Sequence, residues 1–170
     1  EGQATRKKEE QRICLCLTKL GYMQATELGD AAPPAMHFCR EKRIDFRCAG
    51  DIDGKYAYID FVINPGGGKS LIFLEVDENQ HRFGYGEAGC DMKRMGKVME
   101  SLALAECIMR VVWLRYNPNS FKVDGVPQNA RKPQFSHYKK NSREQWLVRR
   151  IAELGTEDDI EPGLSAAIEY

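Results

Sequence analysis

The order of apolar and polar positions along the chain predicts helices and strands typical of an α/β protein. Apolar residues recur every three or four positions over 6–20, which predicts a helix. Alternating or continuous apolar runs predict strands at about 43–48, 56–63 and 70–77, and a glycine-rich turn joins the last two into a hairpin. A second helical stripe follows at about 91–107, with Asp91 in the position of an N-terminal cap.

The second half of the chain predicts a crossover and a last helix. Residues 110–116 form a short apolar run rich in β-branched and aromatic side chains, which is typical of a buried strand. Because a helix separates this run from the strand at 70–77, we expect the two strands to be parallel. A last helix is predicted at 142–154. We therefore expect one α/β domain over 1–155, with a mixed sheet of about four strands flanked by helices, and a flexible acidic tail at 156–170.

Composition places the chain among globular proteins. It has 170 residues, 42% of them hydrophobic, and contains no apolar run of the roughly 18 residues that suggest a membrane span. The six cysteines include no Cys-x-x-Cys pair, which disfavours a zinc site, and Cys14, Cys16 and Cys107 are interpreted as buried apolar residues. We expect reduced thiols and an intracellular protein, cytoplasmic or nuclear, with no membrane partner.

Charge is unevenly spread, although the formal net charge is +0. Residues 121–150 contain eight Lys or Arg against two acids, whereas residues 151–170 contain six acids and no Lys or Arg. Such asymmetry can mark a nucleic-acid surface beside an acidic tail. A solvated loop and a solvated helix face are the alternative interpretation.

Acidic residues lie within or just after the two apolar strands of the predicted hairpin. They are Asp60, Glu75 and Asp77, and His81 follows closely. Buried carboxylates are costly unless they are paired, hydrogen-bonded or bound to a metal. Mg²⁺ prefers oxygen ligands, so Asp60 and Glu75 with the backbone carbonyl of Val76 form a candidate metal site. Any one of these acids could instead be a surface residue at a strand end.

The same residues, in this order, resemble the PD-(D/E)XK nuclease superfamily, and most closely its branch of very-short-patch-repair endonucleases. Asp60 matches the first acid, and Glu75-Val76-Asp77 matches the acid-x-aspartate pattern. His81 matches the nearby histidine, and Asp91 and Arg94 match the aspartate and arginine that open a helix. The apolar strand after that helix also fits. The resemblance covers roughly residues 38–121 and implies a restriction-endonuclease-like fold.

The resemblance implies a metal-dependent endonuclease that hydrolyses phosphodiester bonds in DNA, with RNA as another candidate substrate. Mg²⁺ or Mn²⁺ would be held by Asp60, Glu75 and the Val76 carbonyl, and would polarise the phosphate and activate water. Asp77 is a further candidate ligand and catalytic residue. Glu10 is another candidate ligand, because the family often contributes an acid from its first helix.

One departure from the superfamily pattern concerns its catalytic lysine, whose position is taken by Asp77. His81 is the first candidate to replace it, because imidazole can accept or donate a proton near neutral pH. A structural histidine held by a carboxylate is the alternative. Lys93 or Arg94 could supply positive charge, although an ion pair between Arg94 and Asp91 is the simpler expectation for that arginine.

Basic residues are expected to contact phosphates, with Phe83 and Tyr85 as candidate stackers. The candidate contacts are Lys93, Arg94, Lys122, Arg131, Lys132, Lys139 and Lys140. Two other functions stay open at this point. The chain could be a nuclease-like module that binds nucleic acid without cutting it, or an interaction domain in which the basic loop is incidental.

Overall fold

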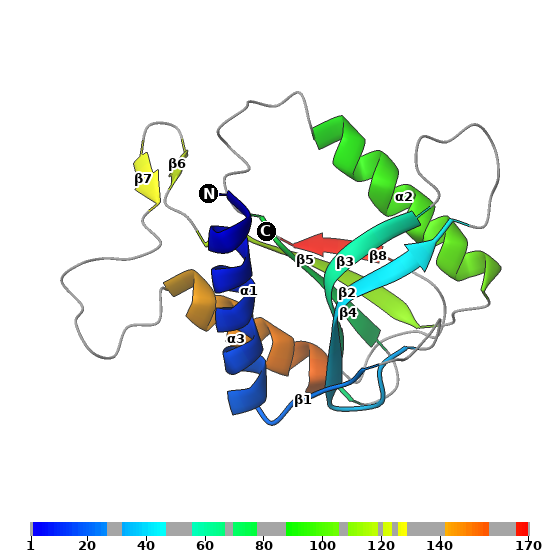
Figure 1. Cartoon of the computed structure of the whole chain (residues 1–170), viewed down its shortest axis with the longest axis horizontal. Coiled ribbons are helices and arrows are strands. Elements are labelled where there is room, and N and C mark those ends of the chain that lie inside the picture. The colour runs from blue at the N-terminus through cyan, green and yellow to red at the C-terminus, as the bar shows by residue number, and fades with distance from the viewer. Residues whose placement is uncertain are drawn as a thin grey trace.

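A mixed β-sheet with helices on both faces forms the centre of the protein (Figure 1). The computed structural model describes residues 2–26, 32–46, 56–66, 70–77, 88–105, 109–118, 121–123, 126–128, 142–156 and 166–169. Within these residues, the sheet has six strands in the order β1-β2-β3-β4-β5-β8. They are β1 (Met23–Gln24), β2 (His37–Asp45), β3 (Tyr56–Asn64), β4 (Ser70–Val76), β5 (Arg110–Tyr116) and β8 (Ala166–Glu169).

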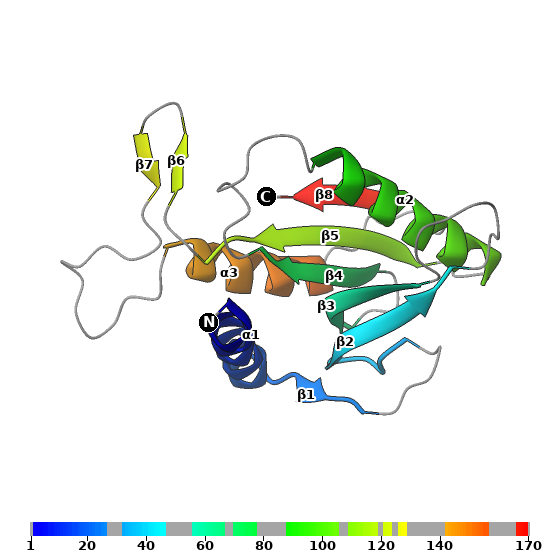
Figure 2. The same ribbon diagram turned by 45° about the horizontal axis from the view of Figure 1, so that its top comes forward.

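The described residues form three helices, which pack on the sheet. They are α1 (Gly2–Lys19), α2 (Ala88–Leu104) and α3 (Ser142–Thr156). Figures 1 and 2 show α1 and α3 on one face of the sheet and α2 on the other. The small hairpin of β6 (Phe121–Val123) and β7 (Val126–Gln128) forms a separate two-stranded sheet.

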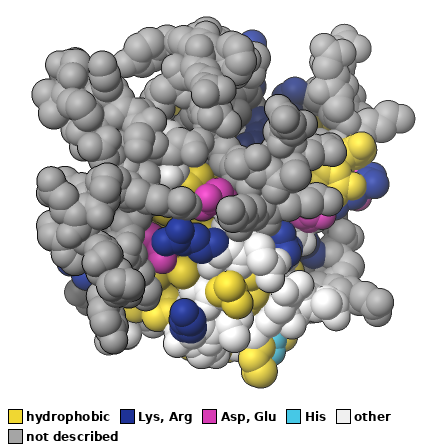
Figure 3. Space-filling model, turned by 60° about the vertical axis from the view of Figure 1, so that its left-hand side comes forward, with side chains coloured by type: hydrophobic (Ala, Val, Ile, Leu, Met, Phe, Trp, Pro, Cys, Tyr) yellow, Lys and Arg dark blue, Asp and Glu magenta, His cyan; other side chains and the backbone are white. Residues whose placement is uncertain are grey.

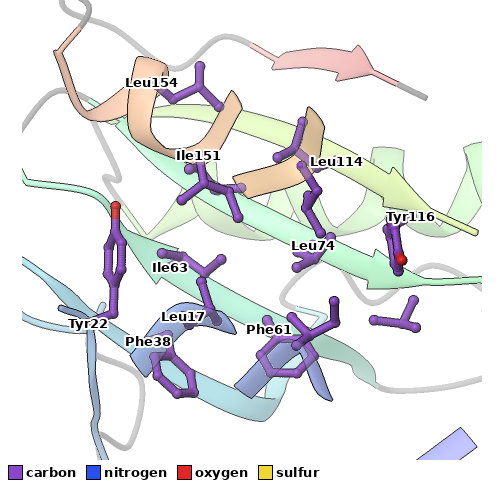
Figure 4. Packing of buried hydrophobic residues seen from close by; sticks show 14 of the residues in the cluster. Leu17, Tyr22, Phe38, Phe61, Ile63, Leu74, Leu114, Tyr116, Ile151 and Leu154 are labelled. Carbon is purple, nitrogen blue, oxygen red and sulfur yellow. The ribbon is translucent and has the colours of Figure 1, made fainter. Parts of the chain in front are cut away.

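The strands bury apolar side chains on both faces, which explains their nearly continuous hydrophobic sequences. The first core lies between the sheet and the helices α1 and α3, and Figure 4 shows part of it around Leu17, Phe61, Leu114 and Ile151. The second core lies between the sheet and α2, where the ring of Trp113 packs edge-on against Phe73. Burying a large apolar side chain contributes roughly 1.5–3 kcal/mol, so the two cores stabilise the sheet.

The predicted hairpin and crossover are confirmed. Strands β3 and β4 pair antiparallel, and β4 and β5 pair parallel from Ser70↔Arg110 to Val76↔Tyr116. Helix α2 connects this parallel pair. The four predicted strands correspond to β2–β5, and the short edge strands β1 and β8 extend the sheet beyond them.

Several boundaries differ from the expected ones. Strand β2 runs over His37–Asp45 rather than about 43–48. Its charged residues hide the strand pattern in the sequence, and its pairing with β3 keeps them in the sheet. Helix α2 begins at Ala88, three residues before the expected cap Asp91. Ala166–Glu169 pairs with β5 as a parallel edge strand, within the segment 156–170 that was expected to be a flexible tail. Among the described residues, no helix is long and apolar enough to cross a membrane.

Candidate functional site

Strands β3 and β4 separate at the candidate acids and form a fork. Their register pairs Ile63 with Ile72 and, at the last pair, Phe61 with Leu74, so its continuation would place Asp60 opposite Glu75. Beyond this pair, a side-chain hydrogen bond takes the place of the backbone ladder. Asp60 Oδ2 accepts it from the Val76 N–H at 2.9 Å. Both acids are buried, with exposed fractions of 6% for Asp60 and 5% for Glu75. The structure therefore brings the two predicted acids together at the end of the β3–β4 ladder.

At Asp60, the odd-numbered side chains of strand β3 change from one face of the sheet to the other. Ala57 and Ile59, before it, pack in the core beneath α2, whereas Phe61 and Ile63, after it, pack in the core beneath α1 and α3. A regular strand would direct all four of these odd-numbered side chains to one face. The change of face is local, since the β2–β3 register is the same on both sides of it.

The neighbouring strand is distorted at the same level. Glu41 stands between Arg40, which pairs with Phe61, and Lys42, which pairs with Ile59, and is therefore opposite Asp60. Its φ angle of 47° lies in the left-handed region, which is uncommon for a residue with a Cβ atom. Backbone strain of this kind is often found beside functional sites. Here it lies opposite the residue at which β3 changes face and separates from β4.

The surroundings of Glu75 destabilise the charged form of its carboxyl group. Its pKa is raised from 4.5 to about 7, mainly by burial and also by the nearby Asp60 and Asp77, while Arg94 opposes the shift. Arg94 Nη2 lies 3.2 Å from Glu75 Oε1, close enough for an ion pair but without the alignment of a hydrogen bond. Glu75 Oε1 is thus a buried carboxyl oxygen that faces Arg94 but accepts no hydrogen bond, and a cation stabilises the charged form of such a group.

Arg94 spans the fork from α2. Besides facing Glu75 on β4, it donates a hydrogen bond through Nη1 to the carbonyl oxygen of Tyr58 on β3, at 3.2 Å. The expected ion pair with Asp91 involves a side chain outside the described part of the chain. Lys93, the neighbouring candidate cation, is exposed on α2.

Asp77 takes part in a different ion pair. Its Oδ2 accepts a hydrogen bond from Arg115 Nε at 2.6 Å, and both side chains are largely buried. The Asp77 N–H also donates to the carbonyl oxygen of Tyr116 at 2.8 Å, which continues the ladder between β4 and β5. Asp77 is therefore anchored to β5 by its side chain and its backbone.

Glu10, the candidate ligand from the first helix, is buried against Arg40. Arg40 Nη2 donates to Glu10 Oε2 at 2.9 Å, and the guanidinium also lies over the ring of Phe61. Nearby, burial raises the pKa of the Cys14 thiol, in keeping with its predicted role as a buried apolar residue. The Glu10–Arg40 pair links α1 to β2 one register position from Asp60.

Many of the other candidate residues lie outside the described part of the chain. These are His81, Phe83, Tyr85, Arg131, Lys132, Lys139, Lys140 and the side chain of Lys122. On the face shown in Figure 3, the described basic side chains are interspersed with acidic and apolar ones rather than gathered into one basic patch.

The described acids can hold a metal only as a small ligand set. Over the ranges that the structure describes, no three His, Cys, Asp or Glu side chains form a group arranged around one ion. Asp60 and Glu75 with a backbone carbonyl form a smaller set, which suits Mg²⁺ because this ion keeps several of its waters. The buried Glu75 oxygen without a donor fits such an ion.

Sequence reasoning named Arg94 but not its partner Glu75, and it missed Arg115 as the partner of Asp77. Arg94 was assigned to Asp91 because the two lie one helical turn apart, and Arg115 is hidden within an apolar strand. A signal for Arg115 existed, since the parallel crossover aligns it with Glu75 in the register of β4 and β5. Comparisons with protein-family models, with curated proteins and with solved structures give no match.

Proposed function

We propose that the protein is a metal-dependent endonuclease with a restriction-endonuclease-like fold that hydrolyses phosphodiester bonds in DNA. The observation that supports this most is the convergence of Asp60 and Glu75, two buried carboxylates, at the end of the β3–β4 ladder. A pair of carboxylates on an antiparallel hairpin, followed by a helix and a parallel strand, is the arrangement that the sequence resemblance implies.

Three described side chains or backbone groups of β3 and β4, one arginine of α2 and His81 have roles in this proposal. Asp60, Glu75 and the Val76 carbonyl would hold Mg²⁺ or Mn²⁺, and the bound ion would supply Lewis-acid polarisation of the scissile phosphate and a lowered pKa for the attacking water. The hydrogen bond from the Val76 N–H fixes one oxygen of Asp60 and directs the carboxylate into the fork. Arg94 neutralises charge on the phosphate, because it is a partly exposed cation held next to Glu75. Proton transfer is assigned to His81.

A second candidate function is nucleic-acid binding without cleavage. The observation in its favour is the ion pair between Asp77 and Arg115, since an anchored aspartate occupies the position where the superfamily carries a catalytic lysine. In this alternative, the acids of the fork are structural and the chain retains only affinity for the nucleic-acid backbone.

Cleavage of plasmid and short oligonucleotides in Mg²⁺ or Mn²⁺ separates the two functions. We expect Asp60→Asn and Glu75→Gln to lower cleavage by about a hundredfold or more, since even residues that only support metal ligands contribute 10–100-fold. Glu100→Gln, on the exposed surface of α2, is the matched control and should cleave normally. Equal cleavage by all variants would refute the assigned site. Salt-sensitive binding without cleavage by the wild type would favour the second function.

A further inference from the structure

Strand β2 changes face at Glu41, at the level at which β3 changes face at Asp60. Phe38, before Glu41, packs in the core beneath α1 and α3, whereas Ile44 and Phe46, after it, pack against the core beneath α2. A regular strand would direct these three even-numbered side chains to one face. The left-handed φ angle of Glu41, 47°, is the local distortion that separates the two halves of the strand.

The change of face places Lys42 on the side of the sheet that carries Glu75. Lys42 lies two positions before Ile44 and is the register partner of Ile59, and both of these apolar side chains face α2. Glu75 faces α2 as well, because the odd-numbered side chains of β4 pack beneath that helix. In agreement with this placement, the charge of Lys42 opposes the rise that burial causes in the pKa of the Cys39 thiol, which is also buried beneath α2.

Lys42 and Arg94 approach the same part of β3 from two different elements. Arg94 reaches from α2 to the carbonyl oxygen of Tyr58 at 3.2 Å, and Lys42 pairs from β2 with the next residue, Ile59. Figures 1 and 2 show the end of β2 beside α2. Both cationic side chains are partly exposed, so their charged ends meet solvent on the face of the fork that carries Glu75.

Two other arginines beside the fork already have acidic partners. Arg115 Nε is 2.6 Å from Asp77 Oδ2, and Arg40 Nη2 is 2.9 Å from Glu10 Oε2. A phosphodiester under hydrolysis gains negative charge on its oxygens, and cations that are already in position stabilise that charge. Lys42 suits this role because its ammonium group carries three donors on a flexible stem.

We propose that Lys42, together with Arg94, binds the phosphate that is cleaved at the fork and stabilises the charge that develops on it. The proposal rests on the proposed function for the identity of the ligand, a phosphodiester of a nucleic acid. It places the nucleic acid on the α2 face of the sheet and adds a catalytic residue from β2. The position of Lys42 was not predictable from sequence, because the alternation of β2 reverses at Glu41.

Arg43 provides a matched control for Lys42. It is the next residue on β2 and carries the same charge, but alternation directs it to the opposite face, where it is the register partner of Tyr58. Its Nη2 is 2.7 Å from Asp45 Oδ1, and about half of its side chain is exposed. Arg43→Met and Lys42→Met therefore remove one charge each from opposite faces of the same strand.

Metal-free binding measures the phosphate contact. The probes are a short fluorescent single-stranded DNA and the matching duplex, titrated in EDTA over a range of salt concentrations, and the variants are compared on the probe that the wild type binds more tightly. On a logarithmic scale, affinity falls with salt by roughly 0.7–0.9 for each phosphate contact. We expect Lys42→Met to reduce this slope by about one contact, and Arg43→Met and Lys42→Arg to retain it.

Cleavage of the same DNA in Mg²⁺ or Mn²⁺ measures the effect on the reaction. Lys42→Met should lower kcat by about a hundredfold, as the loss of one preorganised donor does, whereas Arg43→Met should change it by less than about twofold. Lys42→Arg keeps the charge and should cleave faster than Lys42→Met. A merely structural lysine would not give this recovery together with the retained salt slope.

The two titrations contain the outcomes that would refute the proposal. A wild-type salt slope in Lys42→Met, or equal reductions in Lys42→Met and Arg43→Met, would overturn the phosphate contact. The fate of the proposed function is read independently. If the wild type and Lys42→Met cleave equally, the role of Lys42 is refuted and the endonuclease stands. If the wild type does not cleave while the Lys42-dependent salt slope persists, the endonuclease is refuted and Lys42 remains a phosphate contact.

Discussion

Arg94 Nη2 lies 3.2 Å from Glu75 Oε1, and Nη1 of the same side chain donates to the carbonyl oxygen of Tyr58. One arginine from α2 therefore joins the separated ends of β3 and β4. The contact partly neutralises a buried carboxylate, since Arg94 lowers the pKa of Glu75 against the effect of burial. A cation that binds Glu75 must therefore compete with Arg94.

Glu75 makes stability depend on pH. Its pKa is about 7 in the folded protein against 4.5 for the unperturbed group, so the folded state holds more protons between these values. The free energy of unfolding therefore falls as pH rises from about 4.5 to 7, by roughly 3 kcal/mol at most. Glu75→Gln should remove this contribution. The free energy of unfolding of the variant, relative to that of the wild type, should therefore be higher at pH 8 than at pH 5. Urea unfolding in EDTA at the two pH values measures it, and an identical pH dependence in both proteins would contradict it.

Removal of Arg94 should enlarge the loss of stability that Glu75 causes as pH rises. Arg94→Met leaves Glu75 without its cation, so its pKa should rise further, and the variant should lose about 1 kcal/mol more at pH 8 than at pH 5. Lys93→Met, on the adjacent exposed position, is the control. In Arg94→Met/Glu75→Gln the additional loss at pH 8 should disappear, and its persistence would show that Arg94 acts through another group.

The ion pair between Asp77 and Arg115 should be structural. Arg115→Met leaves a partly buried aspartate without its partner and should lower the free energy of unfolding by about 3 kcal/mol. Arg115→Met/Asp77→Asn should cost less than the sum of the two single changes, because the uncompensated charge is absent. Chemical denaturation of the four proteins completes the cycle. Additive losses would mean that the two side chains do not interact in solution.

The backbone of Glu41 should tolerate glycine. Its φ angle of 47° is strained for a residue with a Cβ atom, so Glu41→Gly should be neutral or should stabilise by up to about 1 kcal/mol. Lys42→Gly, in the paired part of β2, should instead destabilise by about 0.5–1 kcal/mol. Thermal unfolding distinguishes the two variants, and equal losses would argue against strain at Glu41.

The parts of the fold that were predictable from sequence are those with strong apolar patterns. Strands β3, β4 and β5 are nearly continuous apolar runs, and the intervening helical stripe implies their parallel crossover. The start of β2 was missed because the charged residues from Arg40 to Arg43 conceal a strand whose regularity comes from pairing with β3. Strand β8 has only four residues and depends on the edge of β5 for its hydrogen bonds.

The candidate site was predictable in its acids but not in its connections. Asp60 and Glu75 stand out in apolar sequence, and the hairpin places them opposite each other. The partners of the acids come from elements distant in sequence, and helical spacing pointed Arg94 to Asp91 instead of Glu75. The change of face of β3 at Asp60 also depends on packing in two cores, which the local sequence pattern does not predict.

Calorimetric titration with Mn²⁺ at pH 8 tests the central claim, that Asp60 and Glu75 form one metal site. The account predicts a single site in the wild type and in Glu100→Gln, and at least a tenfold loss of affinity in both Asp60→Asn and Glu75→Gln. Arg94→Met should bind Mn²⁺ more tightly than the wild type, because the competing guanidinium is absent. Equal Mn²⁺ affinity in the wild type, Asp60→Asn and Glu75→Gln would contradict the claim.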